Sequence, residues 1–98
     1  LMQQYRLTAL AEADFDGIGE YSLGRWGKNQ AVVYLTKLDE TFSALAQTPS
    51  IGRVRCDLRP GLLSCPCQRH VIFFRRDEGG NVEILRILHE RMDFKRHI

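Results

Sequence analysis

The chain lacks the features that mark a membrane protein, an exported protein or a common enzyme. No window approaches the roughly 18 consecutive apolar residues that a transmembrane helix needs. No charged and then apolar leader opens the chain, so we expect no export signal. A glycine-rich phosphate loop, a His-Glu-x-x-His pair and a serine nucleophile elbow are also missing. The familiar sequence signatures of phosphate-binding, zinc-protease and serine-hydrolase sites are therefore excluded.

Cysteine is scarce, and its count of three is odd. Cys56, Cys65 and Cys67 do not form a disulfide framework, and a reducing cytoplasm is the simplest setting. Together with His70 they could be drawn as a zinc set, but a Cys-x-Cys pair lacks the two-knuckle spacing of structural zinc. We therefore expect no metal and no other cofactor, and we interpret the cysteines as small buried residues.

The composition that remains predicts one globular domain over residues 1–98, with 44% hydrophobic and 27% charged residues. The net charge of +2 is unevenly distributed. Residues 1–49 hold four Lys and Arg against six Asp and Glu, whereas residues 50–98 hold ten against six. The basic second half indicates an acidic partner, either nucleic acid or an acidic protein segment.

Residue periodicity predicts an α+β fold, in which an N-terminal strand and an antiparallel helical hairpin pack on a C-terminal, mainly antiparallel sheet of three to four strands. Residues 3–7 alternate like a short edge strand, and Thr8 can cap the first helix. We expect residues 24–27 to stop this helix and form a turn. The second helix should end at residues 48–49. Its apolar residues recur at three- and four-residue steps: Ala31, Tyr34, Leu35, Leu38, Phe42 and Leu45.

The second half predicts a long loop over residues 49–61 and three strands, over residues 62–66, 69–76 and 82–88. A turn over residues 77–81 joins the last two strands. Arginine and histidine side chains within such apolar strands must pair with a polar or charged partner or lie at a solvent-exposed edge of the sheet. Arg86 is expected on the face of Ile84 and Leu88, where it meets a carboxylate, either internal or on a partner.

Histidine and arginine are the candidate chemical groups of this half. His70, His89 and His97 could act as general acids or bases. A structural role is the stronger interpretation for each of them, least so for His97. The arginines could grip phosphate, although a solvated, salt-bridged face is the simpler interpretation for most of them: Arg53, Arg55, Arg59, Arg69, Arg75, Arg76, Arg86, Arg91 and Arg96.

Four segments, taken in their order and spacing, resemble toxins of the ParE/RelE superfamily over residues 5–97; the first resembles the opening of the superfamily as a whole, and the last three look specifically like its ParE branch. They are Leu7-Thr8-x-x-Ala11-x-x-Asp14-Phe15-x-x-Ile18-x-x-Tyr21 with Arg25-Trp26-Gly27, then Asp57-Leu58-Arg59-Pro60-Gly61-Leu62, then Arg69-His70-Val71-Ile72-Phe73-Phe74-Arg75, and finally Arg86-Ile87-Leu88-His89-x-Arg91-Met92-Asp93. The resemblance implies a cytoplasmic bacterial toxin of a type II toxin–antitoxin pair, with the helical hairpin and antiparallel sheet of that family.

A ParE-like toxin is expected to act on DNA gyrase and to block replication by trapping the enzyme on cleaved DNA, which arrests growth and stabilises a plasmid or chromosome. The resemblance also implies a ParD-like antitoxin, whose disordered C-terminal segment wraps the toxin. A toxin dimer or a heterotetramer with the antitoxin is compatible with this expectation. We expect no catalytic residue, no membrane contact and no direct sequence-specific nucleic-acid binding.

Two surfaces are predicted from the basic second half and from the apolar helix face. The toxic, target-binding surface comprises basic residues of the loop, the strands and an exposed C-terminal tail: Arg59, Arg69, His89, Arg91, Arg96 and His97. The antitoxin is expected in grooves around Tyr34, Leu38 and Phe42 and along Arg86, where its carboxylates would meet arginine.

The alternative is the RelE branch, whose members cut messenger RNA on the ribosome. Such metal-free chemistry uses Arg and Lys to hold charge, and Tyr or His to transfer a proton. All three tyrosines (Tyr5, Tyr21, Tyr34) lie in the first half, and the loop and sheet contain no lysine, which argues against this branch. A reduced set would be Arg69, Arg86, His89 and His97. A plain nucleic-acid-binding module is a third alternative, but the second half lacks evident stacking aromatics.

Overall fold

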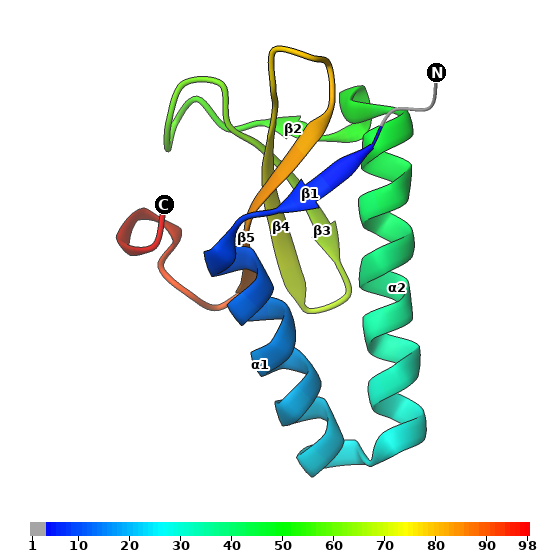
Figure 1. Ribbon diagram of the computed structural model, residues 1–98. Helices are drawn as coiled ribbons and strands as arrows, with labels where there is room; N and C mark the ends of the chain where they lie inside the picture. The colour runs from blue at the N-terminus through cyan, green and yellow to red at the C-terminus, as the bar shows by residue number, and fades with distance from the viewer. Residues whose placement is uncertain (1–3) are drawn as a thin grey trace.

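The computed structural model describes residues 4–98, so Gln3, the predicted first residue of the edge strand, lies outside the described residues. Two helices pack on a five-stranded mixed sheet, which confirms the predicted α+β class (Figure 1). The elements, including two short 3-10 helices η1 and η2, are β1 (Tyr5–Leu7), α1 (Ala9–Trp26), α2 (Lys28–Gln47), η1 (Pro49–Ile51), β2 (Arg53–Val54), β3 (Leu63–Cys67), β4 (His70–Arg76), β5 (Val82–His89) and η2 (Phe94–Arg96).

The strands lie in the order β1-β5-β4-β3-β2, with β1 parallel to β5 and the other neighbours antiparallel. Four strands, β2 to β5, come from the C-terminal half, which agrees with the predicted three to four, but β2 forms inside the segment predicted as a loop. Its two exposed residues, Arg53 and Val54, pair with Ser64 and Leu63. A strand this short has no readable periodicity. Pro66 lies beyond this pairing on the free edge of β3, where a missing N–H costs nothing.

Helix α1 begins as predicted, because the Thr8 hydroxyl accepts a hydrogen bond from the Ala11 N–H at 3.1 Å. The helix does not stop at Gly24, where the predicted stop begins, but continues to Trp26 and ends at Gly27. One interior glycine costs a helix about 1 kcal/mol and is tolerated at Gly24. Gly27 instead adopts φ +89°, which ends α1 and starts α2 at once. The helices therefore form a tight antiparallel pair whose turn extends beyond the sheet (Figure 1).

The main core lies between the helical hairpin and one face of the sheet. The hairpin contributes Ile18, Leu38, Phe42 and Leu45 to it, and the strands contribute apolar residues at alternating positions: Ile72, Phe74, Val82, Ile84 and Ile87. Gly52 is required where the chain crosses this layer, because any side chain there would overlap the ring of Phe74.

A second apolar cluster covers the opposite face of the sheet and includes the C-terminal segment. The ring of Phe94 packs on Phe73 with centroids 4.9 Å apart, and the Arg55 guanidinium lies 5.8 Å from both ring centres. Arg86 Nη1 also donates to the His97 carbonyl at 3.2 Å. The predicted exposed tail is thus packed on the sheet, because Phe94 and Ile98 cover its apolar face. The side chains of Arg96 and His97 remain exposed.

A register shift in the β4–β5 pair changes the predicted position of Arg86. Phe73 pairs with Arg86 and Phe74 with Ile84, so Leu85 is an extra residue in β5. Ile84 consequently packs in the main core, whereas Leu88 packs in the second cluster. The prediction that both share a face with Arg86 was wrong, because an inserted residue reverses the alternation of a strand.

The carboxylate partner of Arg86 is internal, and it attaches α1 to β5. Asp14 of α1 accepts from Arg86 Nε at 2.8 Å and from Nη2 at 3.0 Å. The same carboxylate accepts from the Ile87 backbone N–H at 2.9 Å. The Thr8 N–H donates to the Ile84 carbonyl and the Thr8 hydroxyl to the Leu85 carbonyl. The start of α1 thus satisfies the backbone hydrogen bonds of β5 beyond the end of the short strand β1. The Asp14 hydrogen bond raises the pKa of Arg86.

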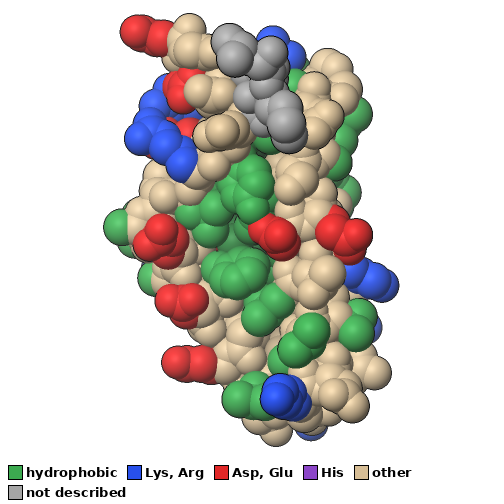
Figure 2. All heavy atoms as spheres, turned by 45° about the vertical axis from the view of Figure 1, so that its right-hand side comes forward, with side chains coloured by type: hydrophobic (Ala, Val, Ile, Leu, Met, Phe, Trp, Pro, Cys, Tyr) green, Lys and Arg blue, Asp and Glu red, His purple; other side chains and the backbone are tan. Residues whose placement is uncertain are grey.

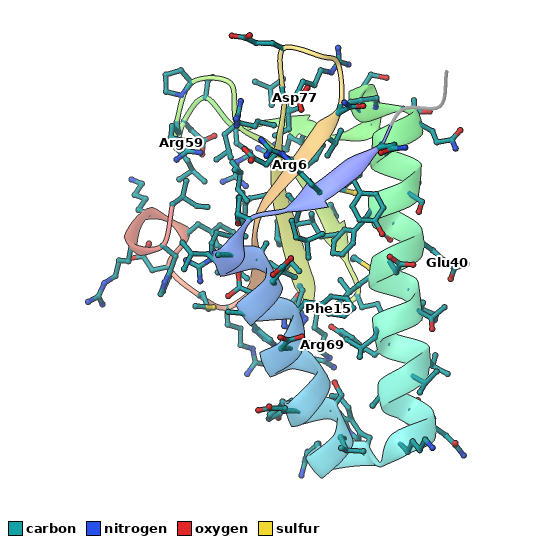
Figure 3. The ribbon with its side chains drawn as sticks, viewed as in Figure 1. Arg6, Phe15, Glu40, Arg59, Arg69 and Asp77 are labelled. Atoms are coloured by element: carbon teal, nitrogen blue, oxygen red, sulfur yellow. The ribbon has the colours of Figure 1, made fainter. Side chains whose placement is uncertain are left out.

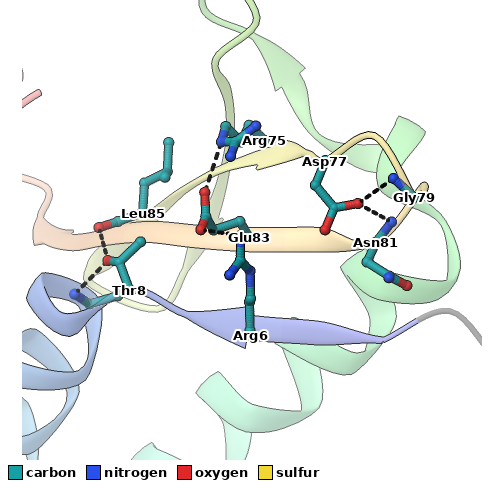
Figure 4. Close-up of polar contacts among 9 residues, drawn as sticks. Arg6, Thr8, Arg75, Asp77, Gly79, Asn81, Glu83 and Leu85 are labelled. Carbon is teal, nitrogen blue, oxygen red and sulfur yellow. Dashed lines mark hydrogen bonds and ion pairs between the residues drawn. The ribbon is translucent and has the colours of Figure 1, made fainter.

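Two further carboxylates fix the other end of β5 (Figure 4). Glu83 pairs with Arg6 of β1 and with Arg75 of β4, each at 2.8 Å, and so bridges three neighbouring strands. Asp77 accepts from the backbone N–H groups of Gly79 and Asn81 and closes the predicted hairpin turn.

We predict that Asp14→Ala lowers the free energy of unfolding by about 2–3 kcal/mol, because it leaves a half-buried guanidinium and the Ile87 N–H without an acceptor. Urea denaturation followed by circular dichroism measures the loss. Asp16→Ala is the matched control: this exposed carboxylate forms no ion pair within residues 4–98 and should change stability by less than about 0.5 kcal/mol. Equal losses in the two variants would contradict the assignment.

Candidate functional site

A cleft of about 740 Å³ opens between the C-terminal half of α1, the turn that joins β3 to β4, and the end of β5. The β3–β4 turn is tight, since Gln68 takes the positive φ of +57° that such hairpin turns favour. This turn places Arg69 at the mouth of the cleft, and the Glu90 N–H donates to the Arg69 carbonyl at 2.9 Å. The cleft therefore lies where the helical hairpin extends past the end of the sheet.

The structure brings half of the predicted target-binding residues into this cleft. Arg69, His89 and Arg91 line it together with Tyr34, which was predicted for the antitoxin. Arg59 lies elsewhere, on the exposed loop beside the C-terminal segment, well away from Arg69 (Figure 3). The exposed side chains of Arg96 and His97 belong to the C-terminal segment as well and do not line the cleft.

The residues predicted for the antitoxin are separated by the fold. Leu38 and Phe42 are 0% and 1% exposed, so their side chains form the main core instead of an open groove. They face the sheet because α2 turns its most apolar stripe toward it. The Arg86 guanidinium is occupied by Asp14. An antitoxin contact of Tyr34 or Arg86 stays a prediction.

Tyr34 and His70 form the polar centre of the cleft. The Tyr34 hydroxyl accepts from the Arg69 backbone N–H at 3.2 Å and lies 2.6 Å from His70 Nδ1. In the tautomer of neutral His70 that leaves Nδ1 unprotonated, the Tyr34 hydroxyl donates to it. Burial raises the pKa of the Tyr34 hydroxyl, which keeps this proton in place at neutral pH. The pair links α2 to the β3–β4 turn.

His89 stands opposite His70 on the neighbouring strand, with ring centres 5.3 Å apart. Burial and, after it, the nearby His89 lower the pKa of His70, so the imidazole is neutral at physiological pH. His89 Nδ1 accepts from the Arg91 N–H at 3.2 Å, which orients its ring along the wall of the cleft. Both imidazoles thus have structural partners, as the sequence favoured.

Three exposed cleft residues appear in the sequence motifs but were not predicted as site residues: Tyr21, Arg25 and Trp26, from the last turns of α1. The indole of Trp26 packs edge-on against Tyr21 at 5.8 Å and nearly parallel to Tyr34 at 6.4 Å between ring centres. The sequence analysis predicts a turn over residues 24–27, so it does not assign Arg25 and Trp26 to a helix face. Tyr21 and Arg25 are four residues apart, so a prediction that extended the helix to Trp26 would have placed them on the same helix face.

A separate apolar groove of about 430 Å³ runs along the outside of the helical hairpin. Figure 2 shows a hydrophobic strip between the two helices with acidic side chains on both sides. Leu23 and Val32 are each 54% exposed here, and Gly19 lets Leu35 pack close against α1. Glu12, Asp16, Glu20 and Glu40 on these helices are exposed and form no ion pair within residues 4–98.

All three cysteines are free thiols, but only Cys67 is buried, with its Sγ 3.4 Å from the Thr41 hydroxyl. Cys65 is half-buried and Cys56 is exposed, so the interpretation of the cysteines as buried residues was wrong for Cys56. Across residues 4–98, no three His, Cys, Asp or Glu side chains gather as metal ligands, so Cys56, Cys65, Cys67 and His70 do not assemble as a zinc set. Neither helix of this range is both long enough and apolar enough to cross a bilayer.

Comparison with known proteins first defines the class. The fold is similar to that of the chromosomal ParDE toxin–antitoxin system of P. aeruginosa, with a TM-score of 0.76 and 26% identity over 90% of this chain and 96% of that one. The toxin–antitoxin complex RelBE2 of Mycobacterium tuberculosis shares the fold at a TM-score of 0.60 and 24% identity, covering 91% of this chain and 99% of that one. The chain thus has the RelE/ParE toxin fold.

Sequence comparison then identifies the branch. Residues 5–94 match the family described as the ParE toxin of the type II toxin–antitoxin system parDE. The chain is 40% identical to Toxin ParE1 of Caulobacter vibrioides over 99% of both chains, and 37% identical to Toxin ParE of Escherichia coli over 94% of this chain and 89% of that one. The chain belongs to the ParE toxin family, as the resemblance implied.

We predict that stability falls as the pH drops from about 7.5 to 5.5, in part through His70. A histidine whose pKa is lowered by folding contributes stability that is complete above the unfolded pKa and is lost as the pH falls through the folded pKa. His70→Gln keeps an acceptor for Tyr34 and should flatten this dependence in urea denaturation. His97→Gln, which changes an exposed side chain, should leave the slope unchanged; a slope equally steep in His70→Gln would contradict the assignment.

Proposed function

We propose that this ParE-family chain inhibits DNA gyrase and so blocks replication, acting by binding rather than by catalysis, and that a ParD-like antitoxin neutralises it. The match to the ParE toxin family over residues 5–94 carries this proposal. The proposed setting is the cytoplasm, where both gyrase and antitoxin reside.

The target surface is proposed to include the predicted basic residues at the cleft and on the C-terminal segment, beginning with two whose side chains form no ion pair. Arg69 and Arg91 are exposed at the cleft, and neither side chain forms an ion pair within residues 4–98. Arg59 on the loop and Arg96 and His97 on the C-terminal segment are exposed as well and extend the proposed surface. His89 lines the cleft together with Arg69 and Arg91. Unpaired, solvated arginines can form bidentate contacts with carboxylates or phosphates of a target without first breaking an internal pair.

We expect purified protein to inhibit gyrase supercoiling and Arg69→Ala and Arg91→Ala to raise the half-inhibitory concentration several-fold, since each removes one charged contact. The readout is a titration on relaxed plasmid. Arg76→Ala is the control, because this exposed arginine lies at the far end of β4, outside the cleft. Truncation before Phe94 is unsuitable, since it uncovers the second core cluster. Unchanged inhibition in both cleft variants would remove the cleft from the target surface.

The antitoxin segment is proposed to cover the apolar groove of the helical hairpin. Leu23 and Val32 expose apolar surface that a partner helix would bury. The flanking Glu12, Asp16 and Glu20 lie one helical turn apart and repel each other in the isolated toxin. The segment on this face is therefore proposed to carry Lys or Arg beside its apolar residues, in contrast to the acidic segment expected from the sequence. Tyr34 and Arg86 remain the proposed contacts beyond the groove.

We expect Asp16→Lys combined with Glu20→Lys to weaken binding of the co-encoded antitoxin about tenfold or more, because both changes place cations against a basic partner helix. Isothermal titration calorimetry measures the affinity. Glu78→Lys, an exposed reversal on the β4–β5 turn, is the control. Tighter binding by the double variant would show that an acidic segment occupies the groove.

Cleavage of messenger RNA is the second candidate function, and one observation favours it. The fold brings Tyr34 to His70 and places both between Arg69 and Arg91, so a tyrosine from the first half does reach the histidines. Incubation of purified protein with programmed ribosomes distinguishes the two functions. Intact message with inhibited supercoiling supports the gyrase proposal, and cleaved message with normal supercoiling supports the alternative.

A further inference from the structure

The solvent-facing wall of the cleft has an unusual composition. Among its lining side chains larger than alanine, the exposed ones are two aromatics and three arginines: Tyr21, Trp26, Arg25, Arg69 and Arg91. The aliphatic lining residues Ile18, Ile87 and Leu88 are at most 8% exposed, so they form the floor and offer little contact surface. A ligand that enters the cleft therefore meets flat rings and guanidinium groups.

The rings form a continuous row across the cleft. Tyr21, Trp26 and Tyr34 lead to His70 and then His89, with successive ring centres between 5.3 and 6.4 Å apart. Tyr21 is 64% and Trp26 is 47% exposed, so both rings offer contact surface to a ligand in the cleft. Three of these rings come from the helices and two from the sheet, so only the assembled fold presents the row.

The lining of the cleft carries a net positive charge, and the exposed Glu90, outside the lining, is a further carboxylate whose charge acts on Tyr34 and His70. Asp14 is the one carboxylate among the described lining residues, and Arg86 already neutralises it. Arg25, Arg69 and Arg91 make no ion pair with any residue of the range 4–98. An occupant must supply negative charge to these arginines, together with planar groups for the rings.

We propose that the cleft binds single-stranded nucleic acid, with bases stacked on Tyr21 and Trp26 and phosphates held by Arg25, Arg69 and Arg91. Successive bases and phosphates supply both requirements at once, and stacking on aromatic rings beside arginine is the general chemistry of single-strand sites. An acidic peptide supplies the charge but no bases to stack on the rings, and apart from Ala13 and Met92 the aliphatic lining that could anchor it is buried. The binding requires neither gyrase nor antitoxin and goes beyond the proposed function.

Trp26 is the only tryptophan of the chain, so its fluorescence reports on this cleft alone. Titration of the purified protein with oligothymidylate should quench it saturably, and oligouridylate in a parallel titration distinguishes DNA from RNA as the preferred strand. Raising the salt concentration should weaken binding, because phosphate contacts release counterions. An acidic peptide of equal net charge should neither quench the fluorescence nor displace the oligonucleotide.

Variants test the two kinds of contact separately. Arg69→Ala and Arg91→Ala should each weaken binding about tenfold and lower the slope of log affinity against log salt by about 0.7. Tyr21→Leu should weaken binding about tenfold, whereas Tyr21→Phe should retain it. The control Arg76→Ala should bind like the unaltered chain. Circular dichroism verifies that each variant is folded.

Three results would overturn the proposal: no quenching by either oligonucleotide, equal weakening by Arg76→Ala and Arg69→Ala, or preferential binding of the acidic peptide. None of them bears on the proposed function, because inhibition of supercoiling is measured separately. Conversely, oligonucleotide binding that depends on Tyr21 and Arg69 supports the cleft as a nucleic-acid site even if gyrase is unaffected.

Discussion

The contact on which the rest of the molecule depends is the one between Asp14 and the strand β5. A single carboxylate accepts two hydrogen bonds from Arg86 and a third from the backbone of Ile87, 73 residues further along the chain. The strand β1 is too short to pair with all of β5, so the free edge would otherwise expose unsatisfied N–H groups. Helix α1 takes over that edge and is thereby held against the end of the sheet. The cleft exists because α1 continues past this attachment.

The distribution of charge over the fold gives the molecule two different surfaces. Every acidic residue of the first half lies on the helical hairpin, whereas the unpaired arginines Arg69 and Arg91 lie at the end of the sheet. The hairpin offers apolar surface flanked by carboxylates, and the cleft offers rings flanked by guanidinium groups. Surfaces of opposite sign suit partners of opposite sign, which is the physical basis for proposing different partners for the two faces.

Much of the fold followed from local patterns, and the errors have physical causes. Thr8, the apolar stripe of α2, the turn at residues 77–81 and the two central strands were predictable because each depends on nearby residues. The strand β2 was missed since two residues carry no period, and Gly24 was read as a stop although one glycine costs a helix only about 1 kcal/mol. The bulge at Leu85 could not be anticipated, because it depends on how β4 and β5 pair.

The sequence by itself determined the α+β class, the basic second half and the ParE family, because composition, periodicity and ordered motifs are properties of the chain. The sequence predicted that Arg86 meets a carboxylate, because a guanidinium in an apolar strand needs a partner. It could not identify Asp14 as that partner, because the choice depends on how α1 packs against β5. Only the tertiary structure decided that Leu38 and Phe42 are core, that Phe94 holds the tail on the sheet, and that Tyr21, Trp26 and Tyr34 meet His70 and Arg69. These residues come from separate elements, and their distances depend on how α1 packs against β5.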